Sequence, residues 1–186
     1  MSDEPRALIA FHTEEGQTEK IADRVADVLR ASGMIVALES ADAETPVQGY
    51  DLVVVGDSIH AVHHSKSLRR FLEDHAAALQ AVPTALFQVS LTSANLDDEH
   101  TATAHGLVQE LLDETGFSPD IVAMFAGALV YTQYGWFKRR VMRAISRREG
   151  GDTDMSRDYD YTDWSAVEQF ARDVHALVQA NEIAAS

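Results

Sequence analysis

The residues between 13 and 18 are of the types that bind a phosphate group. Two hydroxyls flank a glycine just before a helical pattern, where free amides and the helix dipole attract an anion. Gly16 permits a tight turn and a close approach of the backbone to an oxygen. The segment has neither the lysine of a nucleoside-triphosphate loop nor the G-x-G-x-x-G spacing of a dinucleotide site, so we expect a small monophosphate. The full segment is Thr13, Glu14, Glu15, Gly16, Gln17 and Thr18.

A simpler interpretation of this segment stays open. Thr13 or Thr18 caps the helix in that interpretation, and Gly16 only makes the turn. Thr-x-x-Gly-x-Thr is a short pattern and does not separate the two interpretations by itself. Its place directly after the first strand of the chain favours phosphate binding. Glu14 and Glu15 are compatible with a phosphate dianion only if their carboxylates point to solvent.

Strand-length apolar runs alternate with helical patterns along nearly the whole chain. Strands are expected at residues 7–11, 34–38, 51–59, 84–91 and 120–129, and helices at 20–32, 67–79, 101–115 and 164–180. This alternation predicts a parallel sheet with right-handed crossovers and helices on both faces. We therefore expect an α/β fold with a doubly wound, five-stranded sheet in the order 2-1-3-4-5. Ligands of such sheets bind beyond the carboxyl ends of the strands, in the loops that follow residues 11, 59, 91 and 129.

The composition restricts the chemistry of the chain. Its 186 residues include no cysteine, which excludes disulfides, iron–sulfur clusters and thiolate sites, so any redox chemistry needs a bound cofactor. The net charge of −15 disfavours nucleic-acid binding and suggests, as a hypothesis, a halophilic source. No apolar run approaches the length of a membrane span, and the acidic start does not read as a secretory leader. We expect one cytoplasmic domain over residues 1–186, with an insert at 130–161.

The insert concentrates aromatic and basic side chains. Apolar residues recur at helical spacing among its arginines, which predicts a basic amphipathic helix. A connection of this length is expected to be structured or functional. The aromatic residues are Tyr131, Tyr134, Trp136 and Phe137, and the basic residues are Lys138, Arg139, Arg140, Arg143, Arg147 and Arg148.

Three interpretations of the insert remain open, and they are mutually compatible. The helix packs its apolar side on the domain, with arginines that balance an acidic protein. Alternatively, its basic face contacts anionic lipid headgroups at a membrane surface. In the third interpretation, arginine forks bind the carboxylates of a substrate whose ring system stacks on the aromatic residues.

Four motifs occur in an order that resembles a known family. The motifs are the 13–18 loop, Gly56-Asp57-Ser58-Ile59, Ala126-Gly127-Ala128-Leu129 and Tyr161-Thr162-Asp163-Trp164. Together with the basic insert, which ordinary flavodoxins lack, they make nearly the whole chain similar to the flavodoxin-type, menaquinone-dependent protoporphyrinogen IX dehydrogenases. The phosphate loop alone is shared with all flavodoxins, whereas the other motifs and the insert are more specific.

The resemblance implies FMN as the cofactor, with its 5′-phosphate in the 13–18 loop and its isoalloxazine between the loops after strands three and four. The family oxidises protoporphyrinogen IX and passes the electrons to a quinone, so a quinone and a porphyrinogen are the implied partners. The insert residues Tyr131, Tyr134, Trp136, Arg139, Arg140 and Arg143 are then expected to contact substrate or the inner face of the membrane. The flavin-flanking residues implied by position are Ser58, Ile59 and His60 on one side, and Ser90, Leu91, Thr92 and Ser93 on the other.

The loop after the third strand departs from the family pattern because it is rich in histidine. His60, His63 and His64 form H-x-x-H-H, which could bind zinc or copper. Only Asp57 lies nearby as a further ligand, so we expect no metal site and solvated imidazoles, with His60 near the flavin. No side chain is assigned as a catalytic acid or base, because the flavin N5 takes the hydride. An electron-carrier flavodoxin, whose insert docks a redox partner, and a flavin-free interaction module remain alternatives.

Overall fold

Five parallel strands form the central sheet of the protein. The computed structural model describes residues 4–14, 16–59, 64–90, 98–126, 128–129 and 159–185. Within these residues the strands are ordered β2-β1-β3-β4-β5, so the predicted order is confirmed. The strands are β1 (Arg6–Phe11), β2 (Ile35–Ser40), β3 (Leu52–Ser58), β4 (Thr84–Ser90) and β5 (Ile121–Ala126).

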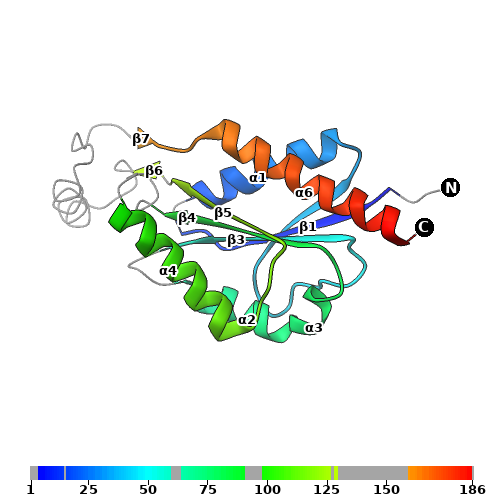
Figure 1. Ribbon diagram of the computed structural model, residues 1–186, viewed down its shortest axis with the longest axis horizontal. Helices are drawn as coiled ribbons and strands as arrows, with labels where there is room; N and C mark the ends of the chain where they lie inside the picture. The colour runs from blue at the N-terminus through cyan, green and yellow to red at the C-terminus, as the bar shows by residue number, and fades with distance from the viewer. Residues whose placement is uncertain are drawn as a thin grey trace.

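Helices cover both faces of the sheet (Figure 1). On one face lie α1 (Gln17–Ala31) and α6 (Trp164–Ala185), and on the other lie α2 (Lys66–Asp74), α3 (Ala76–Leu79) and α4 (Asp98–Thr115). The chain termini lie at the end of the molecule opposite the short strands β6 (Ala128–Leu129) and β7 (Tyr159–Asp160). None of the described helices is both long enough and apolar enough to cross a bilayer.

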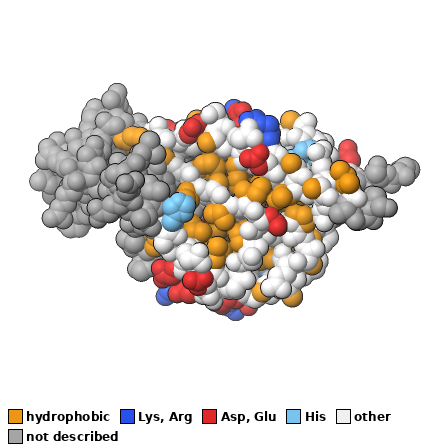
Figure 2. Space-filling model, in the orientation of Figure 1, with side chains coloured by type: hydrophobic (Ala, Val, Ile, Leu, Met, Phe, Trp, Pro, Cys, Tyr) orange, Lys and Arg blue, Asp and Glu red, His pale blue; other side chains and the backbone are white. Residues whose placement is uncertain are grey.

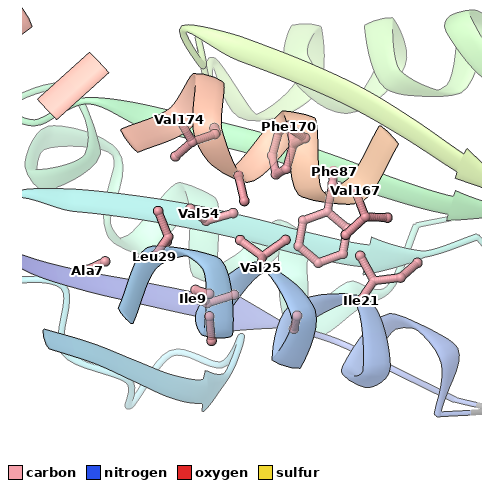
Figure 3. Packing of buried hydrophobic residues seen from close by; sticks show 14 of the residues in the cluster. Ala7, Ile9, Ile21, Val25, Leu29, Val54, Phe87, Val167, Phe170 and Val174 are labelled. Atoms are coloured by element: carbon pink, nitrogen blue, oxygen red, sulfur yellow. The ribbon is translucent and has the colours of Figure 1, made fainter. Parts of the chain in front are cut away.

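Alternation along the central strands divides the buried side chains between two clusters. Ala7 and Ile9 of β1 face α1 and α6, whereas Leu8 and Ala10 face α2 and α4. Helix α1 contacts the first cluster with Ile21 and with further apolar residues that follow it at helical spacing (Figure 3). The side chains of α1 and α6 that pack together there are Ile21, Val25, Leu29, Val167, Phe170 and Val174.

Three aromatic rings fill the carboxyl half of the α1/α6 cluster. Phe87 lies 6.1 Å from both Phe125 and Phe170 between ring centroids. Gly56 of β3 lies directly under the Phe87 ring, where an added Cβ would come within 2.2 Å of the Cζ atom. The ring of Phe87 therefore requires glycine at position 56.

The edge strand β5 leaves apolar side chains accessible to solvent. Figure 2 shows them gathered on the face where, in Figure 1, β5 lies between α6 and α4. Val122 of β5 is 42% exposed. This face is therefore less polar than the net charge of the chain suggests.

Several predicted element boundaries were wrong. Helix α4 begins at Asp98 rather than at residue 101, and α6 ends at Ala185 rather than at residue 180. Helix α1 begins at Gln17 rather than at residue 20, because Gly16 (φ 84°) places the helix start inside the loop. The helix predicted at 67–79 is interrupted at His75, whose backbone (φ −109°, ψ 10°) leaves the helical region. The strand predicted at 120–129 ends at Ala126, and β6 then pairs antiparallel with β7.

The short ladder of β6 and β7 joins the two ends of the insert. Ala128 pairs with Asp160, and Leu129 pairs with Tyr159. Residues 130–158, and with them the expected amphipathic helix, lie outside the described residues. The division into one domain with an insert at 130–161 stays a prediction.

Candidate functional site

The carboxyl ends of β1, β3 and β4 lie side by side at one edge of the sheet, because the three strands are adjacent and parallel. Helix α1 begins directly beyond β1 at this edge. The backbone amide of Ile59 donates to the carbonyl of Val89 at 2.9 Å, which ties the ends of β3 and β4 together. The loops named from the sequence therefore leave the sheet from neighbouring positions.

The loop before α1 is shaped by Gly16. Its amide donates to the Thr13 hydroxyl at 3.0 Å, and its positive φ closes the turn. No atom lies within 4 Å of where a Cβ would stand, so the backbone conformation, and not lack of space, favours glycine. Glu14 is exposed, as phosphate binding requires of it, and Glu15 lies outside the described residues.

Thr18 has a hydroxyl whose partner is missing among the described residues. The residue is 1% exposed and lies in the first turn of α1, yet its Oγ1 has no hydrogen bond there. Buried polar groups nearly always have a partner, so a ligand is the natural one at a helix N-terminus. No side-chain hydrogen bond caps α1, whose N-cap residue is Gly16, and the Thr13 hydroxyl instead accepts the amide of that glycine.

A second buried hydroxyl without a described partner belongs to Ser58, the last residue of β3. Strand alternation puts Ser58 on the same face as Val54 and Gly56, which is the face that α1 covers. The hydroxyls of Thr18 and Ser58, the free amides of the first α1 turn and the helix dipole suit a ligand that carries a phosphate and hydroxyl groups. The phosphate and ribityl chain of FMN have this composition.

Gln17 links the loop to the return end of the insert, a connection that the sequence did not reveal. Its Nε2 donates to the Thr162 hydroxyl at 2.8 Å and to the Asp160 carboxylate at 3.1 Å. The Thr162 hydroxyl donates in turn to the carbonyl of Ala126 at 2.9 Å. Residues in or next to three of the four sequence motifs thus meet in the fold. Nothing in the residue pattern predicted the hydrogen bonds that join them.

Asp163 begins the last helix within the fourth motif. The hydroxyl of Ser165 and the amide of Ala166 both donate to its carboxylate, at 2.7 Å and 3.1 Å. The hydrogen bond from the Ser165 side chain, followed by that from the Ala166 amide, holds the pKa of Asp163 below its usual value. This residue has a capping role at the start of α6, next to Thr162.

A buried polar group lies on the other face of the sheet. The Asp57 Oδ2 atom is 2.8 Å from His64 Nδ1, and His64 Nε2 is 3.1 Å from the carbonyl of Leu107 in α4. The expectation of solvated imidazoles was wrong for His64, because this side chain is only 1% exposed. Gln88, in register with Asp57 on β4, is fully buried as well. An acid and an amide within apolar strands were the signal that could have revealed this group.

The remaining candidate residues divide between the described and undescribed parts of the chain. Ser90 is buried at the end of β4. Within the described residues, no group of three histidines or acids could hold a metal ion. The candidates that lie outside the described residues are His60, Leu91, Thr92, Ser93, Tyr131, Tyr134, Trp136, Arg139, Arg140 and Arg143.

The family of the chain follows from comparison with known proteins. The family model described as a flavodoxin domain matches residues 8–156. The chain belongs to this flavodoxin family. It is 34% identical over 180 residues to the protoporphyrinogen IX dehydrogenase [quinone] of Leishmania major, covering 95% of this chain and 77% of that protein. It is 33% identical over 174 residues to the enzyme of the same name from Escherichia coli K12, covering 92% of this chain and 96% of that protein.

Solved structures agree on the fold of this chain. A flavodoxin from the domain Archaea matches with a TM-score of 0.53 at 12% identity, over 94% of this chain and 99% of the other. The flavodoxin of Streptococcus pneumonia TIGR4 matches with a TM-score of 0.52 at 19% identity, over 92% and 98%. The predicted flavodoxin-like fold and the resemblance to the dehydrogenases are both confirmed. FMN, the cofactor expected from the sequence, agrees with this family and with the hydroxyls of the site.

Proposed function

We propose that this flavodoxin-family chain is an FMN-dependent oxidoreductase that oxidises protoporphyrinogen IX and delivers the electrons to a quinone. The observation that carries this proposal is the similarity to quinone-dependent protoporphyrinogen IX dehydrogenases over more than nine-tenths of the chain. Within the site, the buried Thr18 hydroxyl supports the cofactor half of the proposal.

The loop and the first turn of α1 would hold the phosphate. The amides of Gln17 and Thr18 lie at the positive end of the helix dipole, and the Thr18 hydroxyl adds a donor there. Thr13 shapes the turn through its bond to the Gly16 amide, and Glu14 is exposed. Phosphate binding in this arrangement relies on oriented backbone dipoles rather than on lysine or arginine.

The ring of the cofactor would lie between the loops after β3 and β4. Bound FMN supplies the hydride-accepting N5 atom, and the protein supplies orientation and exclusion of water. The chain's contribution on one side is Ser58, Ile59 and His60. On the other side it is Ser90, Leu91, Thr92 and Ser93. No side chain of this set is required to move a proton, so we assign no catalytic acid or base.

The insert would bring substrate to this edge. Gln17 connects the phosphate loop with Asp160 and Thr162, so the return of the insert is attached to the cofactor site. Its aromatic and arginine residues suit the ring system and carboxylates of a porphyrinogen, or the headgroups of a membrane that holds the quinone. The residues assigned to this role are Tyr131, Tyr134, Trp136, Arg139, Arg140 and Arg143.

Two half-reactions test the proposed function. The purified protein should be yellow with FMN, and protoporphyrinogen IX should reduce the oxidised form under anaerobic conditions. Because porphyrin formation removes more electrons than one FMN accepts, several equivalents of the oxidised protein should be consumed for each porphyrin formed. The reduced form should then be reoxidised by a menaquinone analogue. A yellow protein that reacts with neither substrate would be an electron carrier, and a colourless protein that does not bind added FMN would contradict the proposal altogether.

Deletion of residues 131–158 separates the two parts of the molecule. The shortened chain retains β6 and β7 and should bind FMN, but it should lose quinone reduction because the substrate-contacting residues are gone. Quinone reduction at the full rate by the shortened chain would refute a substrate role for the insert.

A further inference from the structure

The hydrogen-bond geometry of His64 determines how many protons its ring carries. The Leu107 carbonyl opposite Nε2 can only accept, so Nε2 carries a proton. The Asp57 Oδ2 atom opposite Nδ1 also accepts the amide of Ser65, at 3.3 Å. We place the shared proton on Nδ1, because Oδ2 also accepts the Ser65 amide and an ionised carboxylate oxygen suits both bonds as an acceptor. His64 is then an imidazolium, and Asp57 is its counter-ion.

Both partners of this pair are buried. Their side chains are 1% and 0% exposed, and a buried charge is tolerated only when it is paired and hydrogen-bonded. Oδ2 of Asp57 is satisfied by His64 and Ser65, whereas Oδ1 has no partner among the described residues. The carboxylate therefore needs one more donor.

Gln88 lies beside the unsatisfied oxygen. It is paired in register with Asp57 across strands that lie about 4.8 Å apart, so the two side chains share one face of the sheet. Both amide atoms of Gln88 are buried and also lack a partner within the described residues. A buried water typically satisfies about three such polar groups. One water between Asp57 Oδ1 and the Gln88 amide would satisfy atoms of both side chains.

The pair also joins the two segments that lead to the FMN ring. Asp57 is the last but one residue of β3, and His64 is the first described residue after positions 60–63. Leu107 belongs to α4, which follows residues 91–97. The imidazole of His64 therefore connects the end of β3, the start of α2 and the middle of α4 from below the carboxyl edge of the sheet.

We propose that Asp57 and His64 form a buried ion pair, completed by a water that Gln88 holds, which positions the two loops on either side of the FMN ring. His64 and Asp57 are positioning residues here, because neither is placed against the cofactor itself. The inference rests on the proposed FMN site for its functional part. Its structural part, the protonation of His64 and the water, stands independently of that site.

Nitrogen NMR of the full-length protein tests the ion pair directly. At neutral pH both ring nitrogens of His64 should carry a proton in the wild type. In Asp57→Asn, an amide donor replaces the carboxylate, so Nδ1 should lose its proton while Nε2 keeps its own. A wild-type His64 with one protonated nitrogen would overturn the ion pair. A high-resolution crystal structure without a water between Asp57 Oδ1 and Gln88 would overturn the hydration of the pair.

Ligand titrations test the positioning role. Asp57→Asn should raise the Kd for FMN by about tenfold, on the scale of one lost hydrogen bond to a charged group, and should shift the flavin midpoint potential. The affinity for inorganic phosphate should be unchanged, because α1, whose first turn carries Thr18, packs on the other face of the sheet. Asp120→Asn is the matched control, since its carboxylate accepts the Thr84 amide at 2.8 Å at the opposite edge of the sheet.

The possible outcomes separate the two proposals. Equal FMN affinity and equal potential in Asp57→Asn, Asp120→Asn and the wild type would refute the positioning role. A wild type that binds no FMN, with His64 doubly protonated, would instead contradict the proposed function and leave the ion pair standing. If Asp57→Asn does not fold, the wild-type nitrogen spectrum still decides the protonation of His64, and His64→Gln replaces it in the titrations.

Discussion

Replacement of Thr18 by valine should have opposite effects on the free protein and on its complex with FMN. Thr18→Val keeps the shape of the side chain and removes only the hydroxyl, which is buried at the start of α1 and has no partner among the described residues. A ligand-free chain gains from the loss of an unsatisfied polar atom. The FMN complex loses a hydrogen bond to the phosphate.

The sizes of the two effects follow from the state of the hydroxyl. Removing a buried hydroxyl without a partner should raise the free energy of unfolding of the apoprotein by about 1 kcal/mol. A hydrogen bond to a charged group is worth roughly 1.5–3 kcal/mol, so the Kd for FMN should rise by roughly 10- to 150-fold. Urea unfolding of the apoprotein and fluorescence titration with FMN measure the two quantities.

Thr115→Val is the matched control for this prediction. Thr115 is also buried, but its hydroxyl donates to the Leu111 carbonyl at 2.7 Å and accepts the Phe117 amide. The control should lose about 1 kcal/mol of stability and keep its FMN affinity, because Thr115 ends α4 shortly before β5 begins, at the amino edge of the sheet, and its hydroxyl is fully satisfied. A Thr18→Val protein that is less stable than the wild type and binds FMN equally well would refute the assignment of Thr18 to the phosphate.

Three further substitutions have defined outcomes. Gly56→Ala should lower the free energy of unfolding, measured in urea, by about 1–3 kcal/mol, because its Cβ would meet the buried Phe87 ring. Adding Phe87→Leu should recover part of that loss, and no recovery would mean that the ring is not the obstacle. Gln17→Met should cost about 1–2 kcal/mol in the same assay, since it removes both donated bonds to Asp160 and Thr162, and an unchanged midpoint would contradict their contribution. Asp163→Asn should be less stable than the wild type at neutral pH. Since the folded pKa of Asp163 is lowered, the difference in stability between wild type and variant should shrink as pH falls from the ordinary aspartate value of about 3.9 through the lower folded pKa. A stability difference that does not change with pH would argue against the lowered pKa.

Local pattern was sufficient for the elements that bury one continuous apolar face. The strand at residues 7–11 and the helix with Ile21, Val25 and Leu29 have side chains spaced as each element requires, and the structure buries them accordingly. Pattern was insufficient at boundaries. The interruption at His75 and the early start of α1 depend on backbone angles that neighbouring packing and Gly16 determine, and hydrophobic spacing does not report those angles.

The candidate site was predictable in outline because it begins with chemistry that is local in sequence. A glycine and two threonines before a helix that follows the first strand of such a sheet predict a phosphate loop. The flavin-flanking loops were named by position along the same edge. The role of His64 could not be predicted in this way, since its partners are Asp57 on β3 and the Leu107 carbonyl of α4, which lies 43 positions away.

The sequence by itself determined the sheet order and the resemblance that leads to an FMN-dependent dehydrogenase. Each of these depends on short-range spacing or on motif order, which a linear chain displays directly. Only the tertiary structure decided that the hydroxyls of Thr18 and Ser58 are buried without described partners, and that Gln17 bonds to Asp160 and Thr162. Burial and long-range hydrogen bonds exist only once distant segments are packed together, because desolvation and bond geometry are properties of the folded arrangement and not of residue spacing.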